Sequence, residues 1–112
     1  MFTPWGISQN VARYARGLSQ VSTAGHGGFM LGKGFANKYL SPEAIAEGMN
    51  YGNYLCYEED CQWAIVVYEL PQFWSAMYPK TGDVEIFKHV RNSLERWNPE
   101  YLQAKEGFVK ND

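Results

Sequence analysis

The chain has 112 residues and a formal net charge of −2, with 46% hydrophobic and 20% charged residues. This length and balance fit one globular domain with its own core, and they exclude a disordered chain. The 10 Lys and Arg residues are spread along the sequence, so the strong basic field of a nucleic-acid-binding protein is absent and no direct nucleic-acid partner is expected.

Compartment signals in the sequence favour the cytoplasm. No basic and apolar leader opens the chain, and the longest apolar run, residues 63–68, is too short to span a bilayer. The two cysteines, Cys56 and Cys61, are too few for a disulfide framework. We therefore expect one cytoplasmic domain over residues 1–112, with no membrane partner, no cofactor and a frayed polar tail at 105–112.

Aromatic residues are unusually frequent, at 16% of the chain. A core of this size hides only part of them, so some Tyr and Trp side chains are expected at the surface, where they favour partner contacts. Trp63 and Trp97 fall on apolar helical faces and are predicted to be core residues. Trp5 and Trp74 fall in predicted loops, where each either plugs the loop or anchors a partner, and the plug is favoured for Trp5.

A short helix is predicted to begin at Ser8. Val11, Tyr14 and Ala15 recur at helical spacing, and Gly17 suits a left-handed C-terminal cap.

A β-hairpin is predicted over about residues 18–31. Val and Thr favour a strand over 18–23, and Phe29-Met30-Leu31 forms the returning strand. Gly25-His26-Gly27-Gly28 between them is a strong turn signal, whereas Gly32 and Gly34 loosen the chain that follows.

Three further helices are indicated by their ends. Ser41-Pro42-Glu43 combines a capping hydroxyl, a proline in the first turn and a carboxylate near the positive end. Asp83 is predicted to cap a helix whose apolar stripe runs from Ile86 to Trp97. Asn98-Pro99-Glu100 then ends this helix and starts a short final one.

The segment 54–70 supports two interpretations. Residues 63–68 are rich in strand formers, yet residues 61, 64, 65 and 68 follow the helical rule, and the acidic residues 58–60 suit a helix start. We predict a helix over about 58–69, ended by Pro71, with a strand as the alternative. The sequence as a whole predicts an α+β domain: a small antiparallel sheet covered by several short helices.

His26 is the most suggestive candidate for chemistry. Glycines on both sides allow close approach of a ligand, and an imidazole can act as acid or base. The favoured interpretation is simpler: the glycines serve the turn, and the ring binds a neighbouring carbonyl. The glycine spacing matches no phosphate-binding loop.

Cys61 follows three acidic residues, Glu58, Glu59 and Asp60. A nucleophilic thiol needs a base such as His26 and a lowered pKa, whereas three nearby carboxylates disfavour the thiolate. A buried structural cysteine is therefore favoured over a catalytic one. His26, Cys61, Asp60 and Glu58 remain the candidates should the chain be an enzyme.

A metal site is not expected. Cys56, Cys61, His26 and His89 carry suitable ligand atoms, but their spacing matches no common zinc motif. The residues predicted to contact a partner are aromatic or lie in the turn and the acidic block: Trp74, Phe73, Tyr78, His26, Glu58 and Glu59.

Four segments of the chain resemble the blocks of a small domain family of unassigned role. They are Thr3-Pro4-Trp5-Gly6, the segment 21–29 (VSTAGHGGF), the segment 57–64 (YEEDCQWA) and the segment 94–100 (LERWNPE). That family occurs in bacteria, plasmids and phages. The resemblance implies that the Gly-His-Gly-Gly turn and the acidic block share one surface or one core, and it implies no reaction.

Three functions compete on this evidence. The preferred one is a non-catalytic binding protein with a protein partner; the mobile-element association suggests an inhibitor of a host defence nuclease complex, similar to anti-CRISPR proteins. The second is a small hydrolase or transferase that uses His26 with Cys61 or a carboxylate. The third is an accessory domain that self-associates through the aromatic segment 72–79; the sequence leaves the oligomeric state open.

Overall fold

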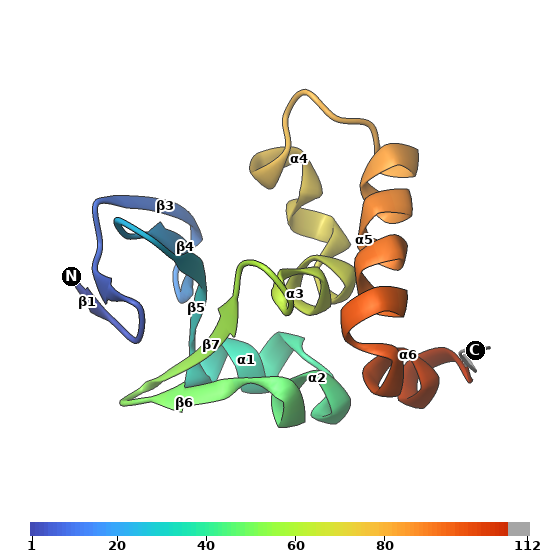
Figure 1. Cartoon of the computed structure of the whole chain (residues 1–112), viewed down its shortest axis with the longest axis horizontal. Coiled ribbons are helices and arrows are strands. Elements are labelled where there is room, and N and C mark those ends of the chain that lie inside the picture. Colours follow the sequence, from blue (N-terminus) through green and yellow to red (C-terminus); the bar gives the residue numbers. More distant parts are fainter. Residues whose placement is uncertain (108–112) are drawn as a thin grey trace.

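The computed structural model describes residues 1–107, in which a five-stranded antiparallel sheet carries helices on one face. The strands lie in the order β3-β4-β5-β7-β6, and a separate small hairpin, β1-β2, lies at the N-terminal end (Figure 1). The strands are β1 (Phe2–Thr3), β2 (Gly6–Ile7), β3 (Asn10–Ala15), β4 (Leu18–Ser22), β5 (Gly27–Gly32), β6 (Met49–Tyr51) and β7 (Tyr54–Glu58). The helices are α1 (Lys33–Tyr39), α2 (Pro42–Glu47), α3 (Trp63–Glu69), the 3-10 turn η1 (Pro71–Phe73), α4 (Trp74–Met77), α5 (Asp83–Trp97) and α6 (Pro99–Glu106).

The α+β prediction and the hairpin are confirmed. Strands β4 and β5 pair antiparallel from Leu18↔Leu31 to Ser22↔Gly27, across the predicted glycine-rich turn. The predicted helix after Ser8 is wrong, because residues 10–15 form β3 and pair with β4. The backbone bonds of this ladder come from the neighbouring strand β4, and this pairing outweighs the helical spacing of the apolar residues. Gly17, with φ of +89°, makes the tight turn between β3 and β4 instead of a helix cap.

In the ambiguous segment 54–70 the strand formers 63–68 are helical, and a strand lies before them. Residues 54–58 form β7, and the helix α3 covers 63–69, so the predicted helix over 58–69 is wrong for its first turn. Leu55 and Tyr57 point into the main core while Cys56 between them lies in a cluster on the other face, which is the period-two pattern of a strand.

Helix ends were predicted with mixed success. Ser41 caps α2 by accepting a hydrogen bond from the Ala44 N–H at 3.2 Å, as expected. Asp83 does not cap α5; Gly82 is the cap residue, and Asp83 provides negative charge in the first turn. Helix α6 begins at Pro99 as predicted and includes residues 105 and 106 of the expected frayed tail, whereas 108–112 lie outside the described residues. Helix α1 was not predicted.

The main core lies between the sheet and the helices. It combines Phe29, Leu31 and Tyr57 of the sheet with the buried faces of α3, α5 and α6. The other face of the sheet carries a smaller cluster of Val21, Met30 and Cys56, against which Trp5 and Tyr51 pack. Trp5 therefore plugs this side, as favoured from the sequence.

The core prediction for Trp97 is wrong, and of the two alternatives for Trp74 the partner anchor is wrong. Trp97 is 52% exposed, because it lies at the end of α5, beyond the buried stripe of Ile86, Val90 and Leu94. Trp74 is only 8% exposed, and its indole N–H donates a hydrogen bond to the Val67 carbonyl at 2.6 Å. The ring of Trp74 is therefore part of the core and not offered at the surface.

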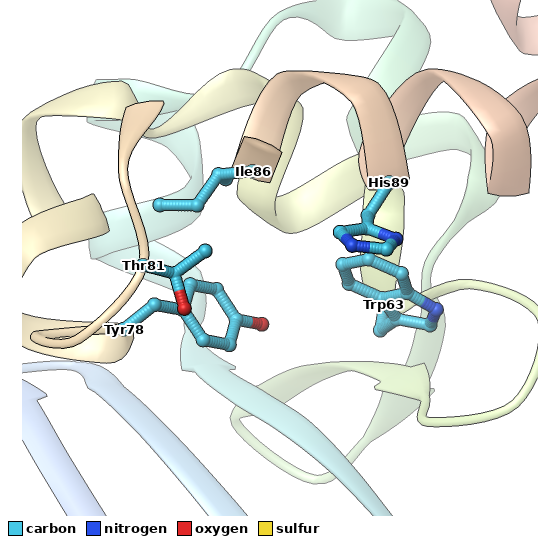
Figure 2. Close-up of a pocket in the computed structure, with 5 residues that line it drawn as sticks. All are labelled: Trp63, Tyr78, Thr81, Ile86 and His89. Atoms are coloured by element: carbon cyan, nitrogen blue, oxygen red, sulfur yellow. The ribbon is translucent and has the colours of Figure 1, made fainter. Parts of the chain in front are cut away.

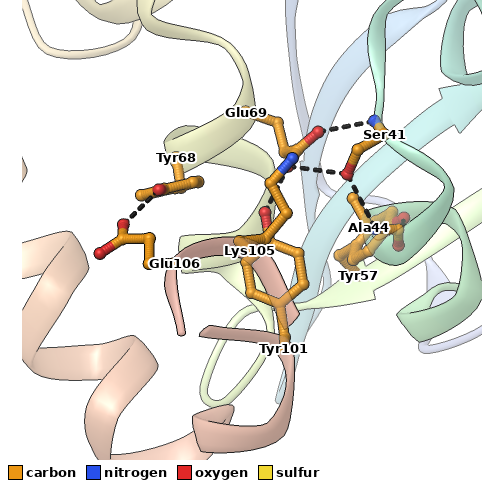
Figure 3. A network of polar contacts seen from close by, with 8 residues as sticks. All are labelled: Ser41, Ala44, Tyr57, Tyr68, Glu69, Tyr101, Lys105 and Glu106. Atoms are coloured by element: carbon orange, nitrogen blue, oxygen red, sulfur yellow. Dashed lines mark hydrogen bonds and ion pairs between the residues drawn. The ribbon is translucent and has the colours of Figure 1, made fainter. Parts of the chain in front are cut away.

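A buried carboxylate joins α2, α3 and α6 (Figure 3). The side chain of Glu69 is 5% exposed and lies 3.4 Å from the Lys105 ammonium. It accepts hydrogen bonds from the Ser41 N–H at 2.7 Å, from the Ser41 hydroxyl at 3.0 Å and from the Tyr101 hydroxyl. Burial and this carboxylate together hold the pKa of Tyr101 far above its usual range. The network fixes the helical layer onto the start of α2.

No helix in the described part of the chain is both long enough and apolar enough to cross a lipid bilayer.

Candidate functional site

The turn that carries His26 lies beside the acidic block at the end of β7. The Glu59 N–H donates to the Gly27 carbonyl at 3.0 Å, which joins the two segments. Thr23 closes the turn: its hydroxyl donates to the His26 carbonyl at 3.0 Å and accepts from the His26 N–H at 3.1 Å. Because the loops are held together in this way, the imidazole of His26 and the acidic side chains share one surface.

The glycines of this turn are required by close packing. A Cβ at Gly28 would lie 2.2 Å from the Tyr57 carbonyl oxygen and 2.6 Å from the Trp5 ring. One at Gly27 would lie 2.4 Å from the Val21 carbonyl oxygen. The interpretation that these glycines serve the fold, and not the approach of a phosphate, fits these distances.

Three of the candidate catalytic residues come together here. Ligand atoms of His26, Glu58 and Asp60 all lie within 4.8 Å of one another, with His26 and Asp60 exposed and Glu58 half-buried. One imidazole nitrogen and two carboxylates form a set that can bind a divalent cation or transfer a proton. No metal site was expected from the sequence, because His26 lies in the turn before β5 whereas Glu58 and Asp60 lie at and after the end of β7, and these segments approach only through strand pairing.

Cys61 is held in a form that suits a structural role. Its thiol donates a hydrogen bond to the Glu58 carboxylate at 3.1 Å, and its N–H donates to the same oxygen at 3.3 Å. The hydrogen bond to Glu58, burial and the charges of Glu58 and Asp60 raise the pKa of the Cys61 thiol to about 11. The thiol is therefore protonated at neutral pH and is a poor nucleophile.

The same contacts act on Glu58 in the opposite direction. Burial favours the protonated acid, but hydrogen bonds from Cys61 and Asp60 outweigh it and lower the pKa of Glu58 below its usual value. Glu58 is therefore ionised at neutral pH. Among residues 1–107, neither Glu58 nor its neighbours Glu59 and Asp60 form an ion pair with a Lys or Arg.

An open cleft begins beside this acidic block, between β4 and the helical layer. Its acidic half has a volume of about 300 Å³ and is lined by Gln20, Glu59, Asp60, Trp63 and Tyr78. The hydroxyl of Tyr14 donates a hydrogen bond to the Gln20 side chain at 2.8 Å and so fixes the amide at this wall.

The apolar half of the cleft shares two of these walls. It has a volume of about 290 Å³ and is lined by Trp63, Tyr78, Thr81, Ile86 and His89. Trp63 and His89 lie on one side, and Tyr78, Thr81 and Ile86 lie on the other (Figure 2). Trp63 and Tyr78 line both volumes, so the two hollows are neighbours that share these walls, and we call the pair the α3–α5 cleft.

The predicted partner residues fall partly in this cleft. Tyr78 and Glu59 line it. Asp60 also lines it and belongs to the cluster that it forms with His26 and Glu58. Phe73 lies elsewhere, in a hollow of about 520 Å³ with Phe35 and Tyr39, and Trp74 is buried.

Five residues of the cleft were not predicted as site residues: Gln20, Trp63, Thr81, Ile86 and His89. The sequence carried one usable signal, because Ile86 and His89 are three apart on the long helix and share a face. Trp63 had been predicted to be core; it packs against the core but is only half-buried, so one side of the ring is left for the cleft.

Comparison with known proteins gives one match. The sequence model of a family described as a domain of unknown function (DUF7007) matches residues 1–111. No curated protein and no solved structure matches the chain.

Proposed function

For this chain, which belongs to the DUF7007 family of domains of unknown function, we propose a non-catalytic role: it binds a protein partner in the α3–α5 cleft. The one observation that carries the proposal is the composition of the cleft. Two aromatic side chains, Trp63 and Tyr78, separate an apolar half from an acidic half with no Lys or Arg ion pair among residues 1–107.

Such a cleft has the properties of a protein-binding hot spot. Binding energy concentrates where a large side chain of one partner fills a pocket lined by aromatic residues. A volume of about 290 Å³ accepts one large apolar side chain, and it is small for a cofactor. Both halves are open to solvent through exposed residues such as Glu59 and Thr81, so a partner reaches them without unfolding the domain.

The state of Cys61 supports binding over thiol catalysis. With its pKa raised to about 11, the thiol has almost no nucleophilic form at neutral pH. The thiol donates its proton in a hydrogen bond to the ionised Glu58 carboxylate, whose negative charge disfavours the thiolate.

A second function is favoured by a different observation. The approach of His26, Glu58 and Asp60 to within 4.8 Å provides an acid–base set that a small hydrolase or transferase could use. Turnover that is lost in His26→Ala and retained in Cys61→Ser would favour this alternative over a purely binding role.

The partner that we propose is a protein of a host defence nuclease complex. The family resemblance and its mobile-element association suggest it, and the acidic half of the cleft suits the basic groove of a nuclease. This part of the proposal depends on the partner's identity and is separable from the use of the cleft.

Photo-crosslinking tests the use of the cleft. Thr81 is exposed on the rim of the apolar half, whereas Gln103 is exposed on α6, at the opposite end of α5 (Figure 1). A benzophenone amino acid at position 81 is expected to capture one protein from source-cell lysate in stoichiometric yield, and the same probe at 103 is not. Identical products from both positions would show non-specific capture and refute the proposed site.

A further inference from the structure

We infer that the partner inserts an arginine into the acidic half of the α3–α5 cleft, beside a large apolar side chain that fills the other half. This inference rests on the proposed function and specifies the chemistry of the partner. It follows from the way in which charge and aromatic rings are divided between the two halves.

The negative charge of the acidic half calls for a cation from outside. Glu59 and Asp60 line it, and both are exposed. Because no Lys or Arg among residues 1–107 forms an ion pair with them or with Glu58, a bound cation meets uncompensated carboxylates. His26 is the basic side chain that reaches this cluster.

The aromatic walls favour a guanidinium over an ammonium ion. Trp63 and Tyr78 flank the acidic half, and a planar guanidinium can lie against an aromatic face while donating paired hydrogen bonds to a carboxylate. An ammonium group is a compact and strongly hydrated charge that uses such a flat site less well.

The apolar half sets the second requirement. Ile86 is 4% exposed and lines the same side as Tyr78, while Tyr78 and Trp63 also line the acidic half. A ligand that reaches both halves must therefore carry its apolar side chain and its arginine close together. The combined site would take a short peptide segment with these two side chains.

Blocked tripeptides provide the probe. We would titrate acetyl-Phe-Gly-Arg-amide into the ¹⁵N-labelled protein and follow the Trp63 indole and Asp60 backbone resonances. The uncharged isostere with citrulline in place of arginine is expected to bind about 5-fold more weakly, and the lysine peptide about 2-fold more weakly. The Trp97 indole, which is exposed outside the cleft, should not shift.

Charge-neutral variants identify the acids responsible. Glu59→Gln with Asp60→Asn removes two charges from exposed side chains without changing their size, and the amide at position 60 can still donate a hydrogen bond to Glu58, so we expect the fold to be retained. We expect this variant to bind the arginine and citrulline peptides equally, while Glu100→Gln on α6 keeps the 5-fold preference of the wild type.

The outcomes separate the inference from the proposed function. Equal affinity of wild type for the arginine and citrulline peptides would overturn the inference, as would the absence of any shift at Trp63 or Asp60. In either case, a partner that is still captured by the probe at position 81 and not by the probe at 103 would support the cleft as a protein-binding site. Capture of the same products from both positions would refute the proposed function itself.

Discussion

Replacing Glu69 with Gln removes one negative charge from the junction of α2, α3 and α6 while keeping the shape of the side chain. Four donor groups converge on this carboxylate, from Ser41, Tyr101 and Lys105, and only 5% of the side chain is exposed. An amide offers one acceptor oxygen, and its NH₂ group would face groups that are themselves donors.

The expected cost follows from the contacts that are lost. A hydrogen bond to a buried charged group contributes about 1.5–3 kcal/mol, and a donor left without an acceptor adds to this cost. We therefore expect Glu69→Gln to lower the free energy of unfolding by about 2–4 kcal/mol. At about 4 °C per kcal/mol for a domain of this size, Tm should fall by roughly 8–16 °C.

Urea denaturation followed by circular dichroism measures this change. Glu85→Gln is the matched control, because 59% of that side chain is exposed; its effect should stay within about 0.5 kcal/mol. If Glu69→Gln unfolds within about 0.5 kcal/mol of the wild type, the reasoning that this network fixes the helical layer is wrong.

Three further outcomes follow from the site and its surroundings. Alkylation of Cys61 by iodoacetamide should rise with pH and level off near a pKa of about 11, and a plateau already reached at pH 8 would contradict the hydrogen bond to Glu58. Gly28→Ala should lower the free energy of unfolding by more than about 2 kcal/mol, because its Cβ would lie 2.2 Å from the Tyr57 carbonyl oxygen. Gly25→Ala is the control, since a Cβ there would have no atom within 4 Å. Equal melting curves of the two variants would refute the packing argument. For Glu106, burial favours the protonated acid, but hydrogen bonds from Tyr68 and Arg91 outweigh it and lower the pKa of the carboxyl group. The ionised carboxylate therefore stabilises the fold above the usual glutamate pKa, and this stabilisation is lost as the pH falls through the lowered pKa. Glu106→Gln should flatten the acid limb of the curve of unfolding free energy against pH, and an unchanged limb would contradict this.

Turn and capping residues in the sequence predicted those elements whose ends they determine. The glycine-rich turn with strand formers on both sides gave the hairpin 18–31, and Ser41-Pro42 and Asn98-Pro99 gave the starts of α2 and α6. The strand β3 was mistaken for a helix because its partner, β4, is what decides its conformation. The predicted helix 58–69 failed at Glu58 for the same reason, since β5 pairs with β7, and residues 59–62 form the turn that leads into α3.

The candidate site was predictable only in part. The family resemblance implied that the acidic block and the turn of His26 share one surface or one core, and the structure places His26 beside Glu58 and Asp60. The cleft itself was not predictable, because it arises where α5 packs against α3. His89 lies opposite Tyr78 only because of that packing, and no sequence motif indicates it.

The most direct test of the account blocks the cleft and measures the affinity of the cross-linked partner. Thr81→Arg places a long side chain at the exposed rim of the apolar half, and Gln103→Arg adds the same side chain on α6. We predict that Thr81→Arg weakens equilibrium binding of the purified partner at least about 10-fold, or 1.4 kcal/mol, while Gln103→Arg leaves it unchanged. Equal affinity of the two variants and the wild type would contradict the claim that the α3–α5 cleft is where this domain binds its partner.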